Sequence, residues 1–249
     1  MKISYPILLL LAFLMHFPSV RAQTPYSEEI YQAYVDGDME KWKSLIQIMN
    51  KEKKDPVQLG FLYELGLLKY GFIAYCIDHD MKEEAREQIE TVLEDIEDMI
   101  EIDPEFAKGY ALWGAVYGFR IQLNPFRAVY LGPRSMDKIE KSIGLDPKTA
   151  AGWLEMANSE FYRPAIFGGD KEQSIETYKK AILYFEKDAS DLKNNWHYLN
   201  ALVALANAYE ETDQLNNAVL QYEKILSIAP DFAWVRDELY PEAIKKAQY

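Results

Sequence analysis

The chain has 249 residues, of which 49% are hydrophobic and 14% aromatic, so it can bury one large core or a continuous stack of repeated elements. Its formal net charge is −13. Phosphate binding needs clustered cations, so this balance argues against nucleic acid and against anionic membrane surfaces as partners. Cys76 is the only cysteine, which excludes an internal disulfide, and we expect it to be packed in the core.

The first 22 residues have the pattern of a secretory signal peptide. A short apolar run, Ile7–Leu14, is followed by Val20–Ala22, which places small residues at the two positions that signal peptidase reads. His16 and Pro18 break the run and disfavour a membrane-spanning helix. We therefore expect cleavage before Gln23 and an exported chain, periplasmic or secreted, with no membrane insertion of its mature part.

The mature chain begins with two predicted helical hairpins. Residues 27–50 predict a short hairpin, and residues 57–102 predict a longer one. Residues 57–78 are apolar on nearly every face, which is typical of a helix buried centrally, and Glu64 and Lys69 within them argue against a transmembrane helix. Residues 81–102 carry their charges on one side, and we expect blocks such as residues 94–98 to form a solvated helix face.

The clearest spacing of the chain runs from Leu202 to Pro230. Apolar and small residues recur three or four positions apart on two successive helices, and a proline closes the second. The residues are Leu202, Leu205, Ala206, Tyr209, Ala218, Tyr222, Ile225 and Pro230. The two alanines let the helices approach closely, and the tyrosines fill the space around them. This pattern resembles the tetratricopeptide repeat.

The same punctuation recurs upstream, because Ile102-Asp103-Pro104 and Leu145-Asp146-Pro147 match Ile228-Ala229-Pro230 as helix endings. The resemblance to the tetratricopeptide superfamily covers residues 104–231. It implies an all-α, right-handed superhelical stack of antiparallel helical hairpins. We place the hairpins at about 27–50, 57–102, 106–146, 150–186 and 196–229, with a capping helix at 232–247. The repeat count before residue 104 stays open, and Pro241 is expected to kink or restart the last helix.

Two turns are longer than this pattern requires. Eighteen residues separate Tyr117 from Ser135, twice the nine between Tyr209 and Ala218, so we read residues 122–134 as inserted chain. A second insertion lies between residues 160 and 174. Both occupy the same turn of adjacent repeats, so stacking should bring them side by side on one edge.

Arginines and aromatic residues gather around the two insertions, and no Asp or Glu occurs from residue 106 to 136. The candidate binding residues are Tyr117, Arg120, Phe126, Arg127, Tyr130, Arg134, Arg163 and Phe167. Arginine suits planar recognition of carboxylate or phosphate. These residues predict a site for an anionic ligand, a peptide carboxyl terminus or an acidic protein. The alternative is that the arginines pair with acids of neighbouring helices and the aromatic rings pack the insertions down.

The segment Pro164–Lys171 is also similar to a Gly-Gly-Asp turn in the periplasmic T-component proteins of TRAP-type transporters, which are helical repeat proteins. Locally, Gly168 and Gly169 allow a tight turn, and Asp170 is placed to cap the helix that follows.

Catalytic and metal-binding motifs are not found in the sequence. The mature chain has two histidines, His79 and His197, and it lacks a zinc-protease motif, a nucleophile elbow, a phosphate loop and an EF-hand. We therefore expect no enzymatic activity, no metal and no cofactor. The expected function is a non-catalytic scaffold or adaptor that binds a protein or peptide through its concave face or its insertion edge. The alternative is an accessory component that binds an anionic small molecule where the arginines converge.

Overall fold

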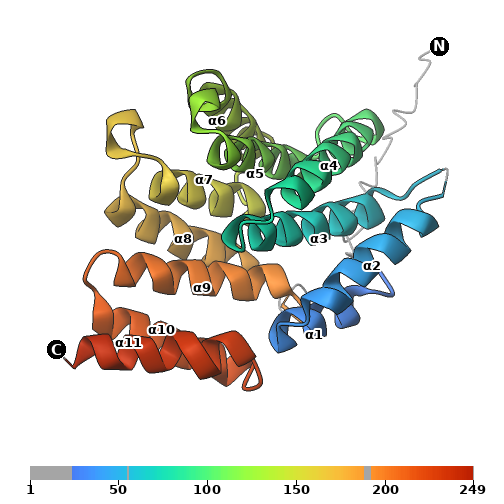
Figure 1. Ribbon diagram of the computed structural model, residues 1–249. Coiled ribbons are helices and arrows are strands. Elements are labelled where there is room, and N and C mark those ends of the chain that lie inside the picture. Colours follow the sequence, from blue (N-terminus) through green and yellow to red (C-terminus); the bar gives the residue numbers. More distant parts are fainter. Residues whose placement is uncertain (1–23, 55, 188–191, 249) are drawn as a thin grey trace, which may run out of the picture.

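The computed structural model describes residues 24–54, 56–187 and 192–248, and the predicted signal peptide lies outside them. Within these ranges all regular elements are helical and stack as antiparallel hairpins, so the predicted fold class is confirmed (Figure 1). The α-helices are α1 (Ser27–Asp36), α2 (Met39–Glu52), α3 (Leu59–Asp78), α4 (Lys82–Ile102), α5 (Ala107–Leu123), α6 (Ala128–Leu145), α7 (Ala150–Tyr162), α8 (Lys171–Phe185), α9 (Trp196–Glu210), α10 (Leu215–Ile228) and α11 (Tyr240–Ala247). The short elements are the 3₁₀ turns η1 (Pro125–Arg127) and η2 (Ala165–Phe167) and the π-helix η4 (Val235–Leu239).

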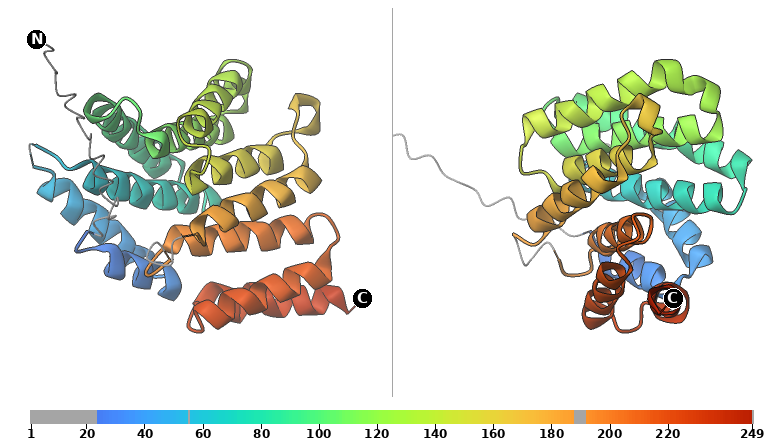
Figure 2. Two further views of the ribbon diagram at one scale, coloured as in Figure 1. Left: turned by 180° about the vertical axis from the view of Figure 1, so that it is seen from behind. Right: turned by 90° about the vertical axis from the view of Figure 1, so that its left-hand side faces the viewer.

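Four consecutive hairpins form the body of the stack: α3–α4, α5–α6, α7–α8 and α9–α10. Each packs on the next, with α4 against α5, α6 against α7 and α8 against α9 (Figures 1 and 2). Helices α4, α6 and α10 end at Ile102, Leu145 and Ile228, two residues before a proline in each case. A proline disfavours the helical conformation of the residue before it, which is why these helices stop there.

Small residues set the closest helix contacts. A Cβ added to Gly114 of α5 would lie 2.6 Å from Cγ1 of Ile139 and 3.0 Å from the carbonyl oxygen of Ser135, both on α6. The Ser135 hydroxyl donates to the Gly114 carbonyl at 2.7 Å. Ala206 and Ala218 are fully buried between α9 and α10, as their spacing predicted. Helix pairs that touch at the backbone in this way can be stacked closely.

The N-terminal helices close the stack against its C-terminal end. Tyr34 of α1 packs on Trp196 of α9 and on Phe232, with ring centroids 5.3 and 5.1 Å apart. Trp42 of α2 meets Trp196 edge-on at 5.0 Å, and its indole N–H donates to the Leu68 carbonyl at 2.8 Å. Aromatic side chains therefore join the first helices to the last repeats.

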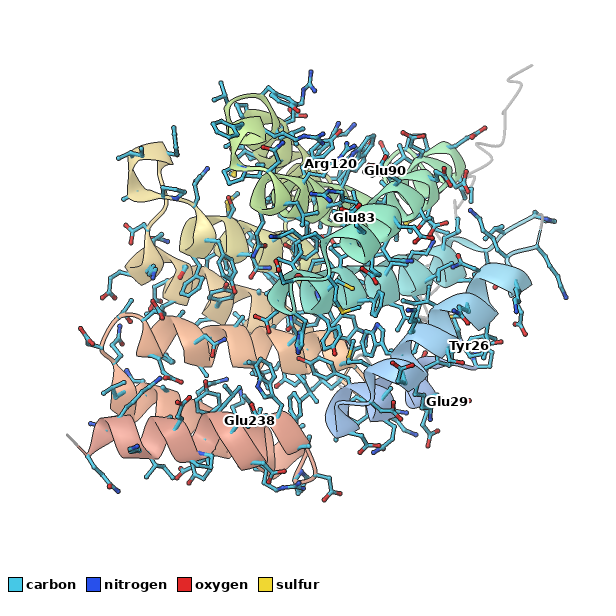
Figure 3. The ribbon with its side chains drawn as sticks, viewed as in Figure 1. Tyr26, Glu29, Glu83, Glu90, Arg120 and Glu238 are labelled. Atoms are coloured by element: carbon cyan, nitrogen blue, oxygen red, sulfur yellow. The ribbon has the colours of Figure 1, made fainter. Side chains whose placement is uncertain are left out.

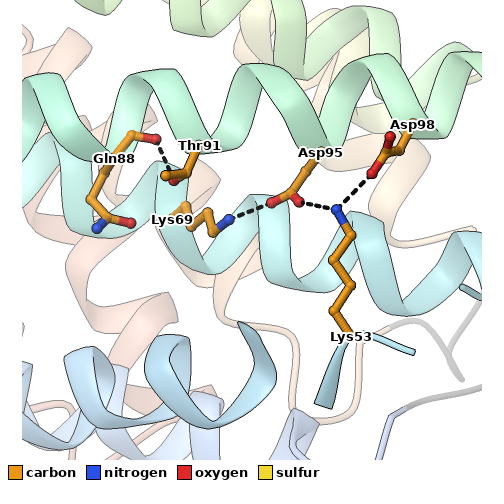
Figure 4. Close-up of polar contacts among 6 residues, drawn as sticks. All are labelled: Lys53, Lys69, Gln88, Thr91, Asp95 and Asp98. Atoms are coloured by element: carbon orange, nitrogen blue, oxygen red, sulfur yellow. Dashed lines mark hydrogen bonds and ion pairs between the residues drawn. The ribbon is translucent and has the colours of Figure 1, made fainter. Parts of the chain in front are cut away.

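A buried ion pair links α3 to α4. Nζ of Lys69 lies 2.5 Å from Asp95, and both side chains are almost fully buried (Figure 4). Lys53 adds contacts to Asp95 at 3.0 Å and to Asp98 at 2.6 Å. The prediction that residues 94–98 are a solvated face is therefore wrong for Asp95, because the buried Lys69 of α3 pairs with it.

The structure also corrects the first insertion. Most of residues 122–134 is helical, since α5 runs to Leu123 and α6 begins at Ala128 with Pro133 inside it. The added residues therefore lengthen the hairpin and leave only a short turn. At the C-terminus, Pro241 lies in the first turn of α11, directly after the π-helix, so it restarts the helix.

Helix α3 is long and apolar enough to cross a membrane by length and composition alone. In the described structure 61% of its most apolar stretch is buried by other helices. Its partners include α4 and α5, as expected for a central helix of a helical stack.

Candidate functional site

The insertion edge consists of two neighbouring turns, the α5–α6 turn (residues 124–130) and the α7–α8 turn (residues 163–170). Both lie at the same end of the molecule, and they project from adjacent hairpins (Figures 1 and 2). The hairpins contact each other through α5, α6 and α7. The two turns are therefore neighbours presented on one edge of the stack.

Backbone hydrogen bonds hold the α7–α8 turn in one shape. The Asp170 N–H donates to the Glu160 carbonyl at 2.8 Å, and the Gly169 N–H donates to the Pro164 carbonyl at 3.2 Å. A Cβ on Gly169 would lie 1.6 Å from the carbonyl oxygen of Arg163, so only glycine fits there. The Asp170 carboxylate accepts from the Gln173 N–H at 3.0 Å, which is the predicted cap of α8.

The α5–α6 turn is held similarly. The Asn124 N–H donates to the carbonyls of Arg120 and Ile121, and the Arg127 N–H donates to the Asn124 carbonyl at 3.0 Å. Pro125 occupies the first position of η1, where a helix needs no N–H. The side chains of both turns are thus presented on fixed backbones.

Large apolar side chains are exposed along the insertion edge. Sequence reasoning selected Phe126, Tyr130 and Phe167, and the structure shows all three exposed. The prediction from the sequence missed Val129, Tyr162 and Ile166, which are also exposed. Their position within the two insertions could have identified them, but the prediction considered only arginines and some of the aromatic residues there. Tyr117 lies on α5, half-buried, with its ring centroid 6.3 Å from that of Trp113.

The four candidate arginines do not converge on one pocket. Arg120 turns to α4 and pairs with Glu90 at 2.8 Å (Figure 3). Arg163 donates to the Gly168 carbonyl at 2.9 Å and so braces its own turn. Arg134 lies over the ring of Tyr130, 5.8 Å from its centroid, and Arg127 is half-buried at the start of α6. For Arg120, therefore, the alternative holds that the arginine pairs with an acid of a neighbouring helix.

A hollow of about 590 Å³ lies beside the α7–α8 turn, and we call it the α7–α8 groove. Its wall includes Phe161 and Tyr162, whose rings meet edge-on at 4.7 Å, and Arg163. Lys171 lies over the Phe161 ring and pairs with Glu211 at 2.7 Å. The remaining lining residues are Pro164, Ala165, Gly169, Asp170 and Glu172. This volume falls within the range of about 300–1,000 Å³ that binding pockets occupy.

Comparison with known proteins agrees with this architecture. A family model described as a tetratricopeptide repeat matches residues 199–232. The fold is that of the tetratricopeptide repeat superfamily. A thermophilic tetratricopeptide repeat protein of Thermus thermophilus is similar, with 16% identity, a TM-score of 0.58, and coverage of 88% of this chain and 97% of that one. The HusA haemophore from Porphyromonas gingivalis has 17% identity, a TM-score of 0.60, and coverage of 76% and 95%. No curated protein matches the sequence.

Side chains of several helices meet on the inner side of the helical stack. Helices α3, α5, α7 and α9 pack in succession along it, and Tyr70 of α3 also reaches His197 of α9. Tyr70 of α3 lies 6.0 Å from His197, and a Cβ on Gly71 would lie 3.2 Å from the Trp196 ring. A cavity of about 150 Å³ remains there, lined by Tyr63, Lys108 and other residues, which is too small for a peptide.

A buried polar cluster lies on the same inner side. The Glu155 carboxyl of α7 accepts from the Asn158 amide at 3.0 Å and is hydrogen-bonded to Tyr70 of α3. Asn158 in turn accepts from the Tyr178 hydroxyl of α8 at 2.8 Å. Burial raises the pKa of Glu155 from 4.5 to about 7, against the opposing effect of these hydrogen bonds. The cluster ties three helices together, and it makes Glu155 a neutral acid below about pH 7.

The described residues hold no group of three metal-ligating side chains. Cys76 is fully buried, and burial raises its pKa to about 11, so the thiolate is scarce at neutral pH. The tetratricopeptide family and its structural neighbours are typically non-catalytic.

Proposed function

We propose that this chain is a non-catalytic, exported interaction scaffold that holds a protein partner at the α7–α8 groove. The tetratricopeptide fold suggests a scaffold for protein–protein interaction. The observation that supports this proposal is the lining of the groove. The rings of Phe161 and Tyr162 and the side chain of Arg163 line it, on a turn fixed by backbone hydrogen bonds. Aromatic and arginine side chains are the usual anchors of protein interfaces.

The groove replaces the concave face as the docking surface of this scaffold. A partner would insert one or two apolar side chains between Tyr162 and the turn, and it would place an acceptor near Arg163. At the edge of the stack the side chains that line the groove stay accessible to a partner.

The test is quantitative binding of partners recovered by affinity purification from an extract of the exported fraction. Tyr162→Ser should weaken binding of the purified partner by about tenfold or more, since it removes the exposed ring from the groove. Trp234→Ser is the matched control, because Trp234 is an exposed aromatic residue that does not line this groove. Equal binding of the partner by both variants would show that the groove does not contact the partner.

Export is a second part of the proposal, and it rests on the signal-peptide pattern of residues 1–22. Expression of the full chain, followed by cell fractionation and N-terminal sequencing, should give an exported protein that begins at Gln23. A protein that retains Met1 in the cytoplasmic fraction would refute this part.

A second candidate function is binding of a flat, anionic small molecule in the same groove, in an accessory role like that of TRAP-type T components. The observation in its favour is the pairing of two aromatic rings with Arg163, which could stack a planar ring and pair a carboxylate. The haemophore HusA has the same fold, and haem is therefore the first ligand to test. Titration should give a saturable change in the haem absorption spectrum that Tyr162→Ser weakens, and a spectrum unaffected by the mutation would reject this candidate.

A further inference from the structure

We propose that the insertion edge also docks the protein peripherally on an anionic lipid bilayer. The contact is made by four apolar side chains, which we call the apolar tips: Phe126, Val129, Ile166 and Phe167. None of the four lines the α7–α8 groove. The bilayer is thus an additional partner of the scaffold, bound through a different set of residues.

The apolar tips stand out by exposure. Phe126, Ile166 and Val129 are 93%, 85% and 82% exposed, and they are the three most exposed large hydrophobic side chains in the described ranges. Phe167 is 60% exposed on the same turn as Ile166. Single exposed apolar residues are ordinary, whereas a group on two neighbouring turns marks an interaction surface.

The shape of the edge favours a bilayer over a protein. The two turns that carry the exposed apolar tips lie at the ends of two hairpins (Figure 2), and the nearby hollow is lined by other residues. A protein partner would need two separate pockets that match these projections. A bilayer interface accepts projecting apolar side chains at any spacing, because acyl chains and headgroups rearrange around them.

The local charge is complementary to anionic headgroups. Arg127 and Arg134 lie within eight residues of Phe126, and residues 106–136 contain no acid. On the α7–α8 turn the cations Arg163 and Lys171 stand beside the acids Asp170 and Glu172, so the excess of cationic charge lies on the α5–α6 turn.

The net charge of −13 would oppose binding to an anionic membrane only if all charges of the protein interacted with that membrane. Screening limits electrostatic attraction to charges within about 8–10 Å of the membrane at physiological salt. The edge is therefore the part of the surface that matters, and each arginine held there strengthens binding by about fivefold. Apolar insertion and cationic attraction together supply the two signals that stable peripheral binding needs.

The test is sedimentation of the mature chain with vesicles of phosphatidylcholine alone or mixed with phosphatidylglycerol. Binding should require phosphatidylglycerol and weaken with salt. The double variant Phe126→Ser/Ile166→Ser should lose about tenfold or more in vesicle binding, because it removes two inserting side chains. The matched control is Leu183→Ser/Leu220→Ser, which removes two side chains that are 55% and 61% exposed on α8 and α10. Absence of binding by the unaltered chain, or equal loss in both double variants, would overturn the proposal.

Insertion is measured separately by a dye that responds to polarity. Cys76 is buried and hardly ionised, so Val129→Cys can be labelled selectively in the folded protein. The label at position 129 should shift to shorter emission wavelength with mixed vesicles, and a label at Leu220→Cys should not. A bound protein whose label at position 129 stays in water would refute insertion.

The roles of the groove and of the apolar tips are distinguished by measuring each variant in both the partner-binding assay and the vesicle assay. Tyr162→Ser should leave vesicle binding unchanged, and the tip variant should leave the purified partner bound. If the tip variant loses the protein partner and the unaltered chain ignores vesicles, the tips belong to the protein interface and the bilayer proposal fails, while the scaffold function stands.

Discussion

Glu155 should make the protein less stable as the pH rises from 4.5 to 7. Its pKa is 4.5 when exposed and about 7 in the fold, so between these values the folded state holds a proton that the unfolded state has lost. The free energy of unfolding then falls with pH at about 1.4 kcal/mol per unit. The loss from Glu155 reaches about 3 kcal/mol near pH 7 and stays constant above it.

Glu155→Gln tests this reasoning, because glutamine keeps the shape and can still bond Asn158 and Tyr70 but cannot ionise. Urea denaturation of both proteins at several pH values from about 4.5 to 8 gives the difference in free energy of unfolding. The free energy of unfolding of the variant should rise relative to that of the unaltered chain as the pH rises, by up to about 3 kcal/mol at pH 8. Glu140→Gln, at an exposed position on α6, should give no such trend. Parallel curves for Glu155→Gln and the unaltered chain would refute the reasoning.

Three further predictions concern the fold. Gly169→Ala places a methyl group against the Arg163 carbonyl, so it should cost about 1–3 kcal/mol and increase proteolysis at the α7–α8 turn; an unchanged denaturation midpoint and digest would contradict this. Lys69→Met leaves the buried Asp95 with Lys53 as its remaining cation and should cost about 3 kcal/mol in a denaturation measurement, whereas the double variant Lys69→Met/Asp95→Leu should recover part of that loss; no cost for the single variant would show that the pair is dispensable. Cys76 should not react with a thiol reagent in the folded protein at neutral pH and should react fully in denaturant, so rapid native labelling would disprove its burial.

Helix ends were predictable from the sequence because proline acts on its own neighbours. The stops of α4, α6 and α10 follow from Pro104, Pro147 and Pro230, without reference to the rest of the molecule. The stacking order also followed, since residues three and four apart share a helix face and each hairpin must bury that face on its neighbour.

Side-chain partners across helices were not predictable in the same way. Asp95 belongs to an acidic block, and its burial depends on Lys69, which lies 26 residues earlier on another helix. Arg120 was grouped with the insertion arginines because of its position in the chain, but its helical phase points it to Glu90 of α4. Spacing and composition singled out two turns on which the structure shows exposed apolar side chains, whereas the direction of each side chain depends on helix phase and on the packing of adjacent hairpins.

The contact of Tyr34 with Trp196 and Phe232 has a mechanical consequence. In an open solenoid each repeat touches only its neighbours, so an end repeat can fray without disturbing distant ones. Here the first helices and the last repeats share one aromatic cluster, and fraying at either end exposes side chains of the other. The closed molecule should consequently resist stretching as one unit and melt in a single cooperative step, with neither end serving as a starting point for unzipping.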